Sequence, residues 1–191
     1  MSRRVGVLGS LCNPPHVGHA ALARAAAEQL DLDLVLLVPT GVPAHRPEPV
    51  VPAATRLALA QAAADAEPVL VCSSVEVDRQ GPSYMADTLE LLLKGDPGAS
   101  LVLLLGADQY ASLDQWHDPG RIRHLAAIAV APRAGSAVDV GAGAEALDMP
   151  VVDVSSTGIR ARVAAGEPID GLVAPGVAAL IAEHGLYRDD A

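Results

Sequence analysis

Aromatic residues and cysteines are scarce in this 191-residue sequence, which has no Phe, three Tyr, one Trp and two Cys. Ala, Leu and Val must therefore fill most of the core, and a hydrophobic content of 51% suffices for one domain. The lone Trp116 stands out, although a single Trp more often packs than binds. Cys12 and Cys72 are sixty residues apart without a nearby partner at zinc-site spacing. Neither a disulfide framework nor a structural metal is predicted.

Positive charge is also in short supply. Thirteen Lys and Arg stand against 23 Asp and Glu, a formal net charge of −10 at pH 7, which argues against broad binding to nucleic acids or anionic membranes. No stretch approaches the roughly 18 consecutive apolar residues of a membrane span. The start "MSRRVGVLGS" lacks the cleavage site of a signal peptide. We therefore expect a cytoplasmic protein with no nucleic-acid or membrane partner.

Short apolar runs alternate with helix-like segments along the chain. The runs are near-continuous, as expected for strands of a parallel sheet covered on both faces. Expected strands cover 4–9, 34–39, 69–77, 100–108, 126–133 and 150–157. Expected helices cover 19–30, 52–64, 85–94 and 119–125. Two short closing helices are expected within 156–168, stopped by Gly166 and Pro168, and within 175–187, with Gly185 after its C-terminus. Residues 134–148 are expected to form a surface connection. The pattern predicts a single α/β domain over residues 1–191, a doubly wound parallel sheet with C-terminal helices.

The stretch "VGVLGSLCNPPHVGH" (5–19) predicts a strand, a turn rich in Gly and Pro, and a helix start near residue 18 or 19. In open α/β sheets, ligands bind beyond the C-terminal ends of strands, where helix N-termini favour anions. His16 and His19 would add donors there. Taken alone, this H-x-x-H pair fits packing or capping best, and a metal site would lack a third ligand. The glycine fingerprint of dinucleotide-binding folds, the P-loop and the nucleophile elbow are all absent from the sequence.

Two motifs about 140 residues apart favour anion binding by His16 and His19 over a packing role. "GSLCNPPHVGH" (9–19) resembles the G-[GST]-[ST]-F-[DN]-P-P-H-x-G-H motif of the nucleotidylyltransferase superfamily, and "VSSTGIR" (154–160) resembles its second motif, I-S-S-T-x-[IV]-R. Four further segments resemble the bacterial nicotinate mononucleotide adenylyltransferases: "VPTGVPAHRP", "GPSYMADTL", "LLLGADQYASLDQWHDPGRI" and "LVAPGVAALIAEHGLY". The resemblance covers nearly the whole chain. It implies a Rossmann-like fold and a reaction in which ATP and nicotinate mononucleotide give deamido-NAD and pyrophosphate.

The sequence departs from the family pattern at four positions. Leu11 replaces a usual Thr or Ser, and Cys12 replaces Phe; Ala44 and Arg46 replace Pro and Lys in the second segment. Leu11 removes a hydroxyl but keeps its backbone N–H. We interpret Cys12 as a small apolar residue rather than a nucleophile.

The resemblance implies a set of ATP-binding residues in which His16, His19 and Arg160 are catalytic. The histidines would stabilise charge around the α-phosphate, and a nearby polyphosphate would favour their protonated form. Residues 155–157 could cap a helix or face the phosphates. The full ATP set is Gly9, Ser10, Leu11, His16, Gly18, His19, His45, Arg46, Gly106, Asp108, Ser155, Ser156, Thr157, Ile159 and Arg160.

For the mononucleotide, the resemblance implies that Trp116 stacks on the pyridine, with Tyr84 and Thr88 in the same pocket. Asp108 would close a strand and bind ribose hydroxyls, and Arg133 would meet the phosphate. The full acceptor set is Asn13, Tyr84, Thr88, Asp108, Trp116 and Arg133.

No acidic cluster suggests a protein metal site, so we expect Mg²⁺ to come with ATP, held mainly by phosphates and water. Three alternatives stay open: an adenylyltransferase for nicotinamide mononucleotide, one for phosphopantetheine, and a nucleotide-binding protein that has lost catalysis. A homo-oligomer is also possible.

Overall fold

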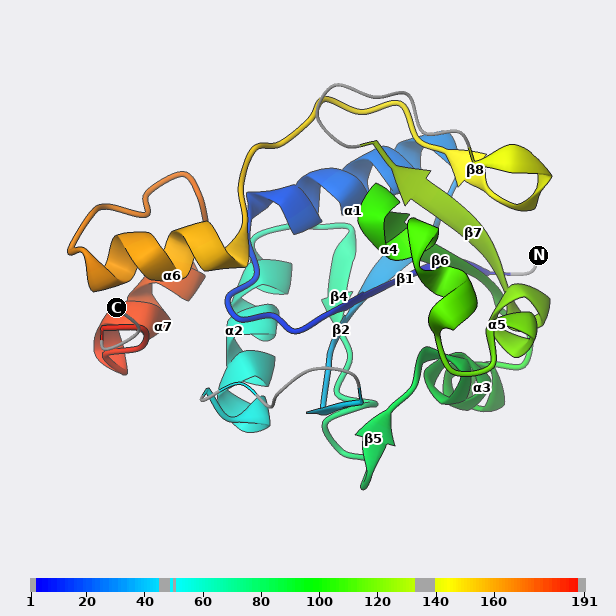
Figure 1. Ribbon diagram of the computed structural model, residues 1–191, viewed down its shortest axis with the longest axis horizontal. Coiled ribbons are helices and arrows are strands. Elements are labelled where there is room, and N and C mark those ends of the chain that lie inside the picture. Colours follow the sequence, from blue (N-terminus) through cyan, green and yellow to red (C-terminus); the bar gives the residue numbers. More distant parts are fainter. Residues whose placement is uncertain (1–2, 45–48, 50, 133–139, 189–191) are drawn as a thin grey trace.

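A parallel sheet with the strand order β4-β2-β1-β6-β7-β8 forms the centre of the computed structural model, which describes residues 3–44, 49, 51–132 and 140–188 (Figure 1). Its strands are β1 (Arg4–Ser10), β2 (Leu34–Pro39), β4 (Leu70–Cys72), β6 (Ser100–Gly106), β7 (Ala126–Ala131) and β8 (Glu145–Ala146). A second, two-stranded parallel sheet joins β3 (Val42–Pro43) to β5 (Pro82–Ser83).

Helices cover both faces and one end of the main sheet. They are α1 (Val17–Gln29), α2 (Ala53–Asp65), α3 (Met85–Gly95), α4 (Ala107–Ala111), α5 (Pro119–Leu125), α6 (Ser156–Ala164) and α7 (Pro175–Glu183). Short 3₁₀ helices occur at η1 (Leu113–Gln115) and η2 (Gly141–Gly143). This architecture confirms the predicted doubly wound α/β fold with C-terminal helices. Within the described ranges, no helix combines the length and the apolar character needed to cross a bilayer.

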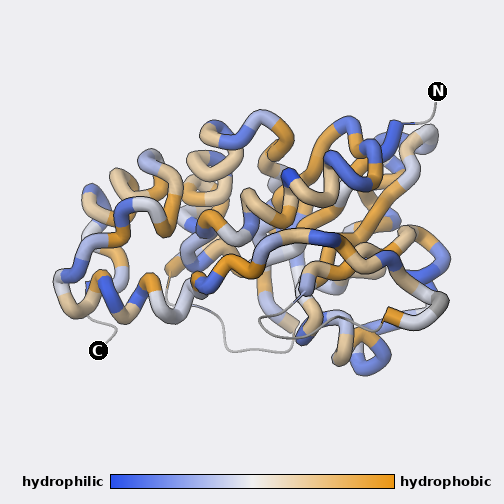
Figure 2. The backbone as a smooth tube through the Cα atoms, turned by 90° about the horizontal axis from the view of Figure 1, so that it is seen from above, coloured by the Kyte–Doolittle hydropathy of each residue, from blue (hydrophilic) through white to orange (hydrophobic). Residues whose placement is uncertain are grey.

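The near-continuous apolar runs are explained by burial on both faces of the sheet. In β6, Leu101, Leu103 and Leu105 belong to the core under α3 and α5, whereas Val102 and Leu104 belong to the core under α1 and α2. Successive side chains of a strand point to opposite faces, so a strand that is covered twice has to be apolar throughout. Figure 2 shows that strongly hydrophobic stretches run mainly through the middle of the molecule.

The sheet reverses its strand order between β1 and β6. From β1 the chain adds β2 and then β4 on one side, and from β6 it adds β7 and then β8 on the other. The two central strands pair directly, with Arg4 opposite Ser100 and Val7 opposite Leu103. A crevice forms at such a reversal beyond the carboxyl ends of the strands, which are Ser10 and Gly106 here.

The two C-terminal helices pack against α2 at the end of the molecule opposite the N-terminus (Figures 1 and 2). Leu59 of α2, Ile159 of α6 and Val177 of α7 are fully or almost fully buried in one shared cluster. Gly185 follows α7 with φ +59°, the left-handed conformation that glycine adopts most easily at the end of a helix. Both predicted C-terminal helices are confirmed, and α6 ends at Ala164, two residues before the predicted stop at Gly166.

The predicted strand at 150–157 is wrong. Residues 151–155 form no strand, and the edge strand β8 lies instead inside 134–148, where the sequence predicts a surface connection. After β8 the chain leaves the sheet and crosses over α1 to reach α6 beside α2 (Figure 1). This path explains the extended, partly exposed "VVDV" segment, in which Val151 is 45% exposed.

Several boundaries also differ from expectation. The run 69–77 is a strand only over Leu70–Cys72, and β6 ends at Gly106, so Asp108 lies in the first turn of α4 instead of closing a strand. Helix α1 begins at Val17, which makes His16 its N-cap residue. The helices predicted at 52–64, 85–94 and 119–125 are confirmed to within one residue.

Candidate functional site

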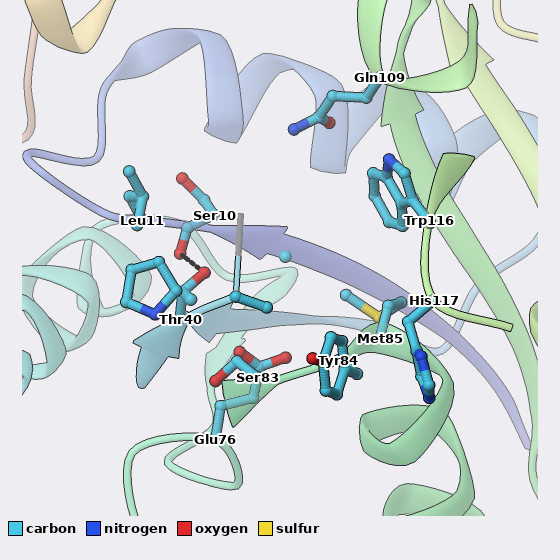
Figure 3. A pocket seen from close by; sticks show the side chains of 13 residues that line it. Ser10, Leu11, Thr40, Glu76, Ser83, Tyr84, Met85, Gln109, Trp116 and His117 are labelled. Carbon is cyan, nitrogen blue, oxygen red and sulfur yellow. Dashed lines mark hydrogen bonds between the residues drawn. The ribbon is translucent and has the colours of Figure 1, made fainter. Parts of the chain in front are cut away.

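A pocket of about 190 Å³ opens at the C-terminal edge of the sheet (Figure 3). Its walls come from the loop after β1, the β2–β3 region, the β5–α3 junction and the segment after α4. The lining residues are Gly9, Ser10, Leu11, Thr40, Pro43, Ala44, Glu76, Ser83, Tyr84, Met85, Gln109, Trp116 and His117. Figure 3 shows Ser10 and Leu11 on one side and Trp116 and Gln109 on the other. Two predicted sets therefore share this pocket: Gly9, Ser10 and Leu11 from the ATP set, and Tyr84 and Trp116 from the acceptor set.

His19 contacts the pocket residue Ser10, and its ring packs against that of His16 at 4.0 Å between centroids. The backbone N–H of His16 donates to Nδ1 of His19 at 3.1 Å, and Nε2 of His19 lies 2.9 Å from Oγ of Ser10. Ser10 Oγ also accepts the N–H of Cys12 at 3.1 Å. Because Nδ1 of His19 is an acceptor, the proton of the neutral ring belongs on Nε2, where it donates to Ser10.

Both imidazoles are neutral at pH 7 in this structure. Burial, with the neighbouring His16 as a lesser cause, lowers the pKa of His19 to about 3, and burial lowers the pKa of His16 to about 4. The expected protonated form would therefore need the polyphosphate itself. Nδ1 of His16 is buried and has no hydrogen-bond partner among the described residues.

The two distant motifs meet at the turn before α1. Ser156 donates its hydroxyl to the carbonyl oxygen of Pro14 at 2.8 Å, and Nη1 of Arg160 donates to the carbonyl oxygen of Asn13 at 3.0 Å. The side-chain oxygen of Asn13 accepts the hydroxyl of Tyr187 at 2.9 Å. Since these donors take the carbonyl side of the turn, α6 and the C-terminal segment hold it in place beside the pocket.

The start of α6 has the geometry of a capped helix. Oγ of Ser155 accepts the N–H of Gly158 at 3.1 Å, and both Ser155 and Thr157 are exposed. Arg160 also reaches Oγ1 of Thr157 at 3.4 Å. Ile159 differs from expectation, because its side chain is 1% exposed and packs in the core, so only its backbone can face a ligand.

On the acceptor side, Trp116 and Tyr84 line the pocket and Thr88 does not. Thr88 is fully buried, and its hydroxyl donates to Oε1 of Glu76 at 2.7 Å. The predicted pocket contact of Thr88 is thus replaced by Glu76, which lines the pocket itself. Burial raises the pKa of Glu76, while hydrogen bonds from Thr88, Ser83 and the Gly41 backbone oppose the rise. The ring of Tyr84 packs against His117 at 4.2 Å between centroids.

Other predicted residues lie around the pocket or outside the described part of the chain. Gly106 is the N-cap residue of α4, and Asp108 is an exposed residue of its first turn, next to the pocket residue Gln109. Gly18 packs against the ring of His16. His45, Arg46 and Arg133 fall outside the residues that the structure describes.

Cys12 is fully buried with φ +52°, and burial raises the pKa of its thiol to about 12. A thiol in this state is inert, which agrees with its interpretation as a packing residue.

Sequence reasoning missed three residues that organise the site: Arg56, Glu76 and Tyr187. Arg56 is the only charged residue in 52–64, and Glu76 is the only one in "VLVCSSVEV". A lone charge within an apolar run is a usable signal, because such a group stays buried only where partners receive it. Tyr187 carried no comparable signal.

The chain is similar to known proteins over nearly its whole length. Residues 8–162 match the family model described as cytidylyltransferase-like. A probable nicotinate-nucleotide adenylyltransferase of Albidiferax ferrireducens is 43% identical over 97% of this chain and 98% of the relative, and one of Roseiflexus sp. is 41% identical over 98% and 99%. The fold matches that of Plasmodium falciparum nicotinic acid mononucleotide adenylyltransferase complexed with NaAD, with a TM-score of 0.79 at 13% identity over 97% and 98% of the two chains. The chain therefore belongs to the nicotinate-nucleotide adenylyltransferase family.

Proposed function

We propose that this protein transfers the adenylyl group of ATP to nicotinate mononucleotide, forming deamido-NAD and pyrophosphate for NAD biosynthesis. The observation that carries the proposal is the meeting of the two phosphate motifs, 142 residues apart at Ser156 and Pro14, beside a pocket lined by Tyr84 and Trp116. The names of the relatives support this reaction, and so does a pocket in which Trp116 lies across from Ser10 and Leu11.

In the proposed reaction, a phosphate oxygen of the mononucleotide attacks the α-phosphorus of ATP. The new P–O bond forms as the bond from the α-phosphorus to the bridging oxygen of pyrophosphate breaks. Both reactants are anions, so alignment and charge stabilisation by His16, His19 and Arg160 suffice without a covalent intermediate. The backbone N–H groups at the starts of α1 and α6 favour the same negative charge.

The substrate we propose is Mg-ATP. Among the described residues, no group of three or more His, Cys, Asp or Glu is placed to hold a metal ion. The ion would therefore be held mainly by phosphates and water, as Mg²⁺ at nucleotide sites often is. A cytoplasmic location remains a prediction of the sequence, and a homo-oligomer remains an open alternative.

Pyrophosphate release from Mg-ATP tests the proposal, with nicotinate mononucleotide, nicotinamide mononucleotide and phosphopantetheine as separate acceptors. Turnover should be fastest with nicotinate mononucleotide and should stop when EDTA removes Mg²⁺. His19→Ala should lower kcat by on the order of 10²-fold, the scale of one electrostatic donor. His184→Ala, which alters an exposed histidine after α7, is the matched control and should leave kcat unchanged.

Each alternative has its own outcome in this assay. A preference for either other acceptor would replace the proposed substrate. ATP binding without turnover on any acceptor would indicate a nucleotide-binding protein, and normal turnover of His19→Ala would remove this imidazole from the mechanism.

A further inference from the structure

Arg56 is the largest fully buried side chain of the described residues, with 0% of its surface exposed. It lies on α2, away from both phosphate motifs in the sequence, and its neighbours along the helix are Thr55 and Leu57. Burial of a guanidinium is costly unless its N–H groups find acceptors. The carbonyl groups that accept hydrogen bonds from Arg56 therefore indicate its role.

The guanidinium donates to main-chain carbonyl oxygens of three separate segments. Nη1 donates to Leu11 at 2.9 Å and also to Thr40, Nη2 donates to Gly41 at 2.9 Å, and Nε donates to Val51 at 3.2 Å. Leu11 belongs to the loop after β1, Thr40 and Gly41 follow β2, and Val51 precedes α2. One planar group with N–H donors in a fixed fork thus sets the spacing between these segments.

The bond to Leu11 continues as a chain of hydrogen bonds to His19. The carbonyl of Leu11 and the N–H of Cys12 belong to one peptide group, and that N–H donates to Oγ of Ser10 at 3.1 Å. Ser10 Oγ also receives the Nε2 proton of His19 at 2.9 Å. The orientation of the Leu11–Cys12 peptide therefore determines where Ser10 holds the imidazole.

This peptide needs support from outside the loop. Cys12 has φ +52°, a left-handed conformation that costs a non-glycine residue on the order of 1 kcal/mol. Arg56 supplies that support from α2 on the carbonyl side, opposite the N–H that faces Ser10.

We propose that Arg56 is a positioning residue for the reaction, which fixes the Leu11–Cys12 peptide and, through the hydrogen bond between Ser10 Oγ and Nε2–H, fixes the position of the His19 ring. Arg56 does not line the pocket and acts through these bonds rather than on substrate. Its effect on turnover rests on the proposed function, whereas its effect on the Nε2–H hydrogen bond of His19 does not.

The test combines kinetics with ¹⁵N NMR of the His19 ring. Arg56→Lys keeps the charge but cannot reach all three segments, so kcat should fall about 10- to 100-fold, as expected for a misplaced catalytic group, while KM values change less. The Nε2–H signal of His19 should shift and its proton should exchange faster with solvent, because the hydrogen bond to Ser10 is weakened. Leu59→Ala is the matched control, because it removes a fully buried side chain from the same helix. It should lower stability and leave both the Nε2–H signal and kcat as in the wild type.

Ser10→Ala tests the route of the effect. If Arg56 acts through Ser10, the kcat of the double variant with both Arg56→Lys and Ser10→Ala should be no lower than that of Ser10→Ala alone. Losses that multiply in the double variant, or an unchanged Nε2–H signal in Arg56→Lys, would overturn the proposal. Should Arg56→Lys fail to fold, Ser10→Ala decides alone, since an unchanged Nε2–H signal in that variant would show that Ser10 does not hold the ring. A wild-type protein without turnover would refute the proposed function and leave the NMR result to judge this inference.

Discussion

Gly41 shows how closely the backbone segments at the pocket approach one another. A Cβ built on this residue would lie 2.2 Å from the carbonyl oxygen of Glu76 and 3.2 Å from Oγ of Ser83. The carbonyl is backbone and cannot rotate away as a flexible side chain could. The same glycine accepts a hydrogen bond from Arg56, so any displacement would also disturb the guanidinium.

Gly41→Ala should therefore lower the free energy of unfolding by about 2 kcal/mol or more, the range of overpacked interiors. Gly95→Ala is the matched control, because no atom lies within 4 Å of its Cβ position at the end of α3. It should change stability by less than about 1 kcal/mol. Urea unfolding of both variants at 25 °C measures the difference, and equal stabilities would contradict the tight contact at Gly41.

Individual residue types were more predictable than their partners. The motifs located His16, His19 and Arg160, yet the hydrogen bond from His19 to Ser10 and the bond from Arg160 to Asn13 depend on how the turn folds. Thr88 illustrates the limit. Its segment was identified, but which side of α3 faces the pocket is decided by Glu76, a carboxyl that must find donors when it is buried.

The start of α6 has two candidate roles, capping the helix and binding phosphate, which two substitutions of Ser155 can separate. Ser155 caps the helix by accepting the N–H of Gly158, and in the proposed function its exposed position also faces ATP phosphates. Asp caps a helix as well as Ser does but adds a negative charge, whereas Ala removes the cap.

Ser155→Ala should lose about 1 kcal/mol of stability, and Ser155→Asp should keep the wild-type value. The order should reverse for ATP: Ser155→Asp should raise KM by about tenfold or more, because its carboxylate repels the phosphates, and Ser155→Ala should raise it less. Urea unfolding and KM measurements on the same preparations give both values. An unchanged KM for ATP in Ser155→Asp would show that the Ser155 hydroxyl acts only as a helix cap.

Elements with strong periodic patterns were predictable, and those set by the path of the chain were not. The strands β1, β2, β6 and β7 are buried on both faces and could be recognised from apolar runs alone. By contrast, β8 has only two residues, both exposed, and "VVDV" is apolar without joining the sheet. The need to carry Ser155 and Ser156 from the far edge of the sheet to the turn before α1 determines that path, and it is a tertiary constraint with no local signal.

For the molecule as a whole, the two buried imidazoles link stability to pH. In the unfolded chain a histidine binds its proton near pH 6.5, whereas burial lowers the pKa of His19 to about 3 and that of His16 to about 4 in the folded protein. Between these values the unfolded chain binds more protons than the folded one. The contribution of the neutral rings is therefore complete above about pH 6.5 and is lost as the pH falls toward about 4 for His16 and about 3 for His19.

We accordingly expect the melting temperature of the wild-type protein to fall between pH 6.5 and 4.5 more steeply than that of a His16→Gln, His19→Gln double variant. The corresponding difference in the free energy of unfolding should be at most about 1.4 kcal/mol per pH unit for each histidine, and less because both side chains are only half-buried by surface area. Glu76 acts in the opposite sense, since a raised carboxyl pKa adds stability as the pH falls, but it is present in both proteins and cancels in the comparison. His184→Gln is the control and should follow the wild type. Parallel melting curves for the wild type and the double variant across this range would mean that His16 and His19 take up protons in the folded protein as readily as in the unfolded chain.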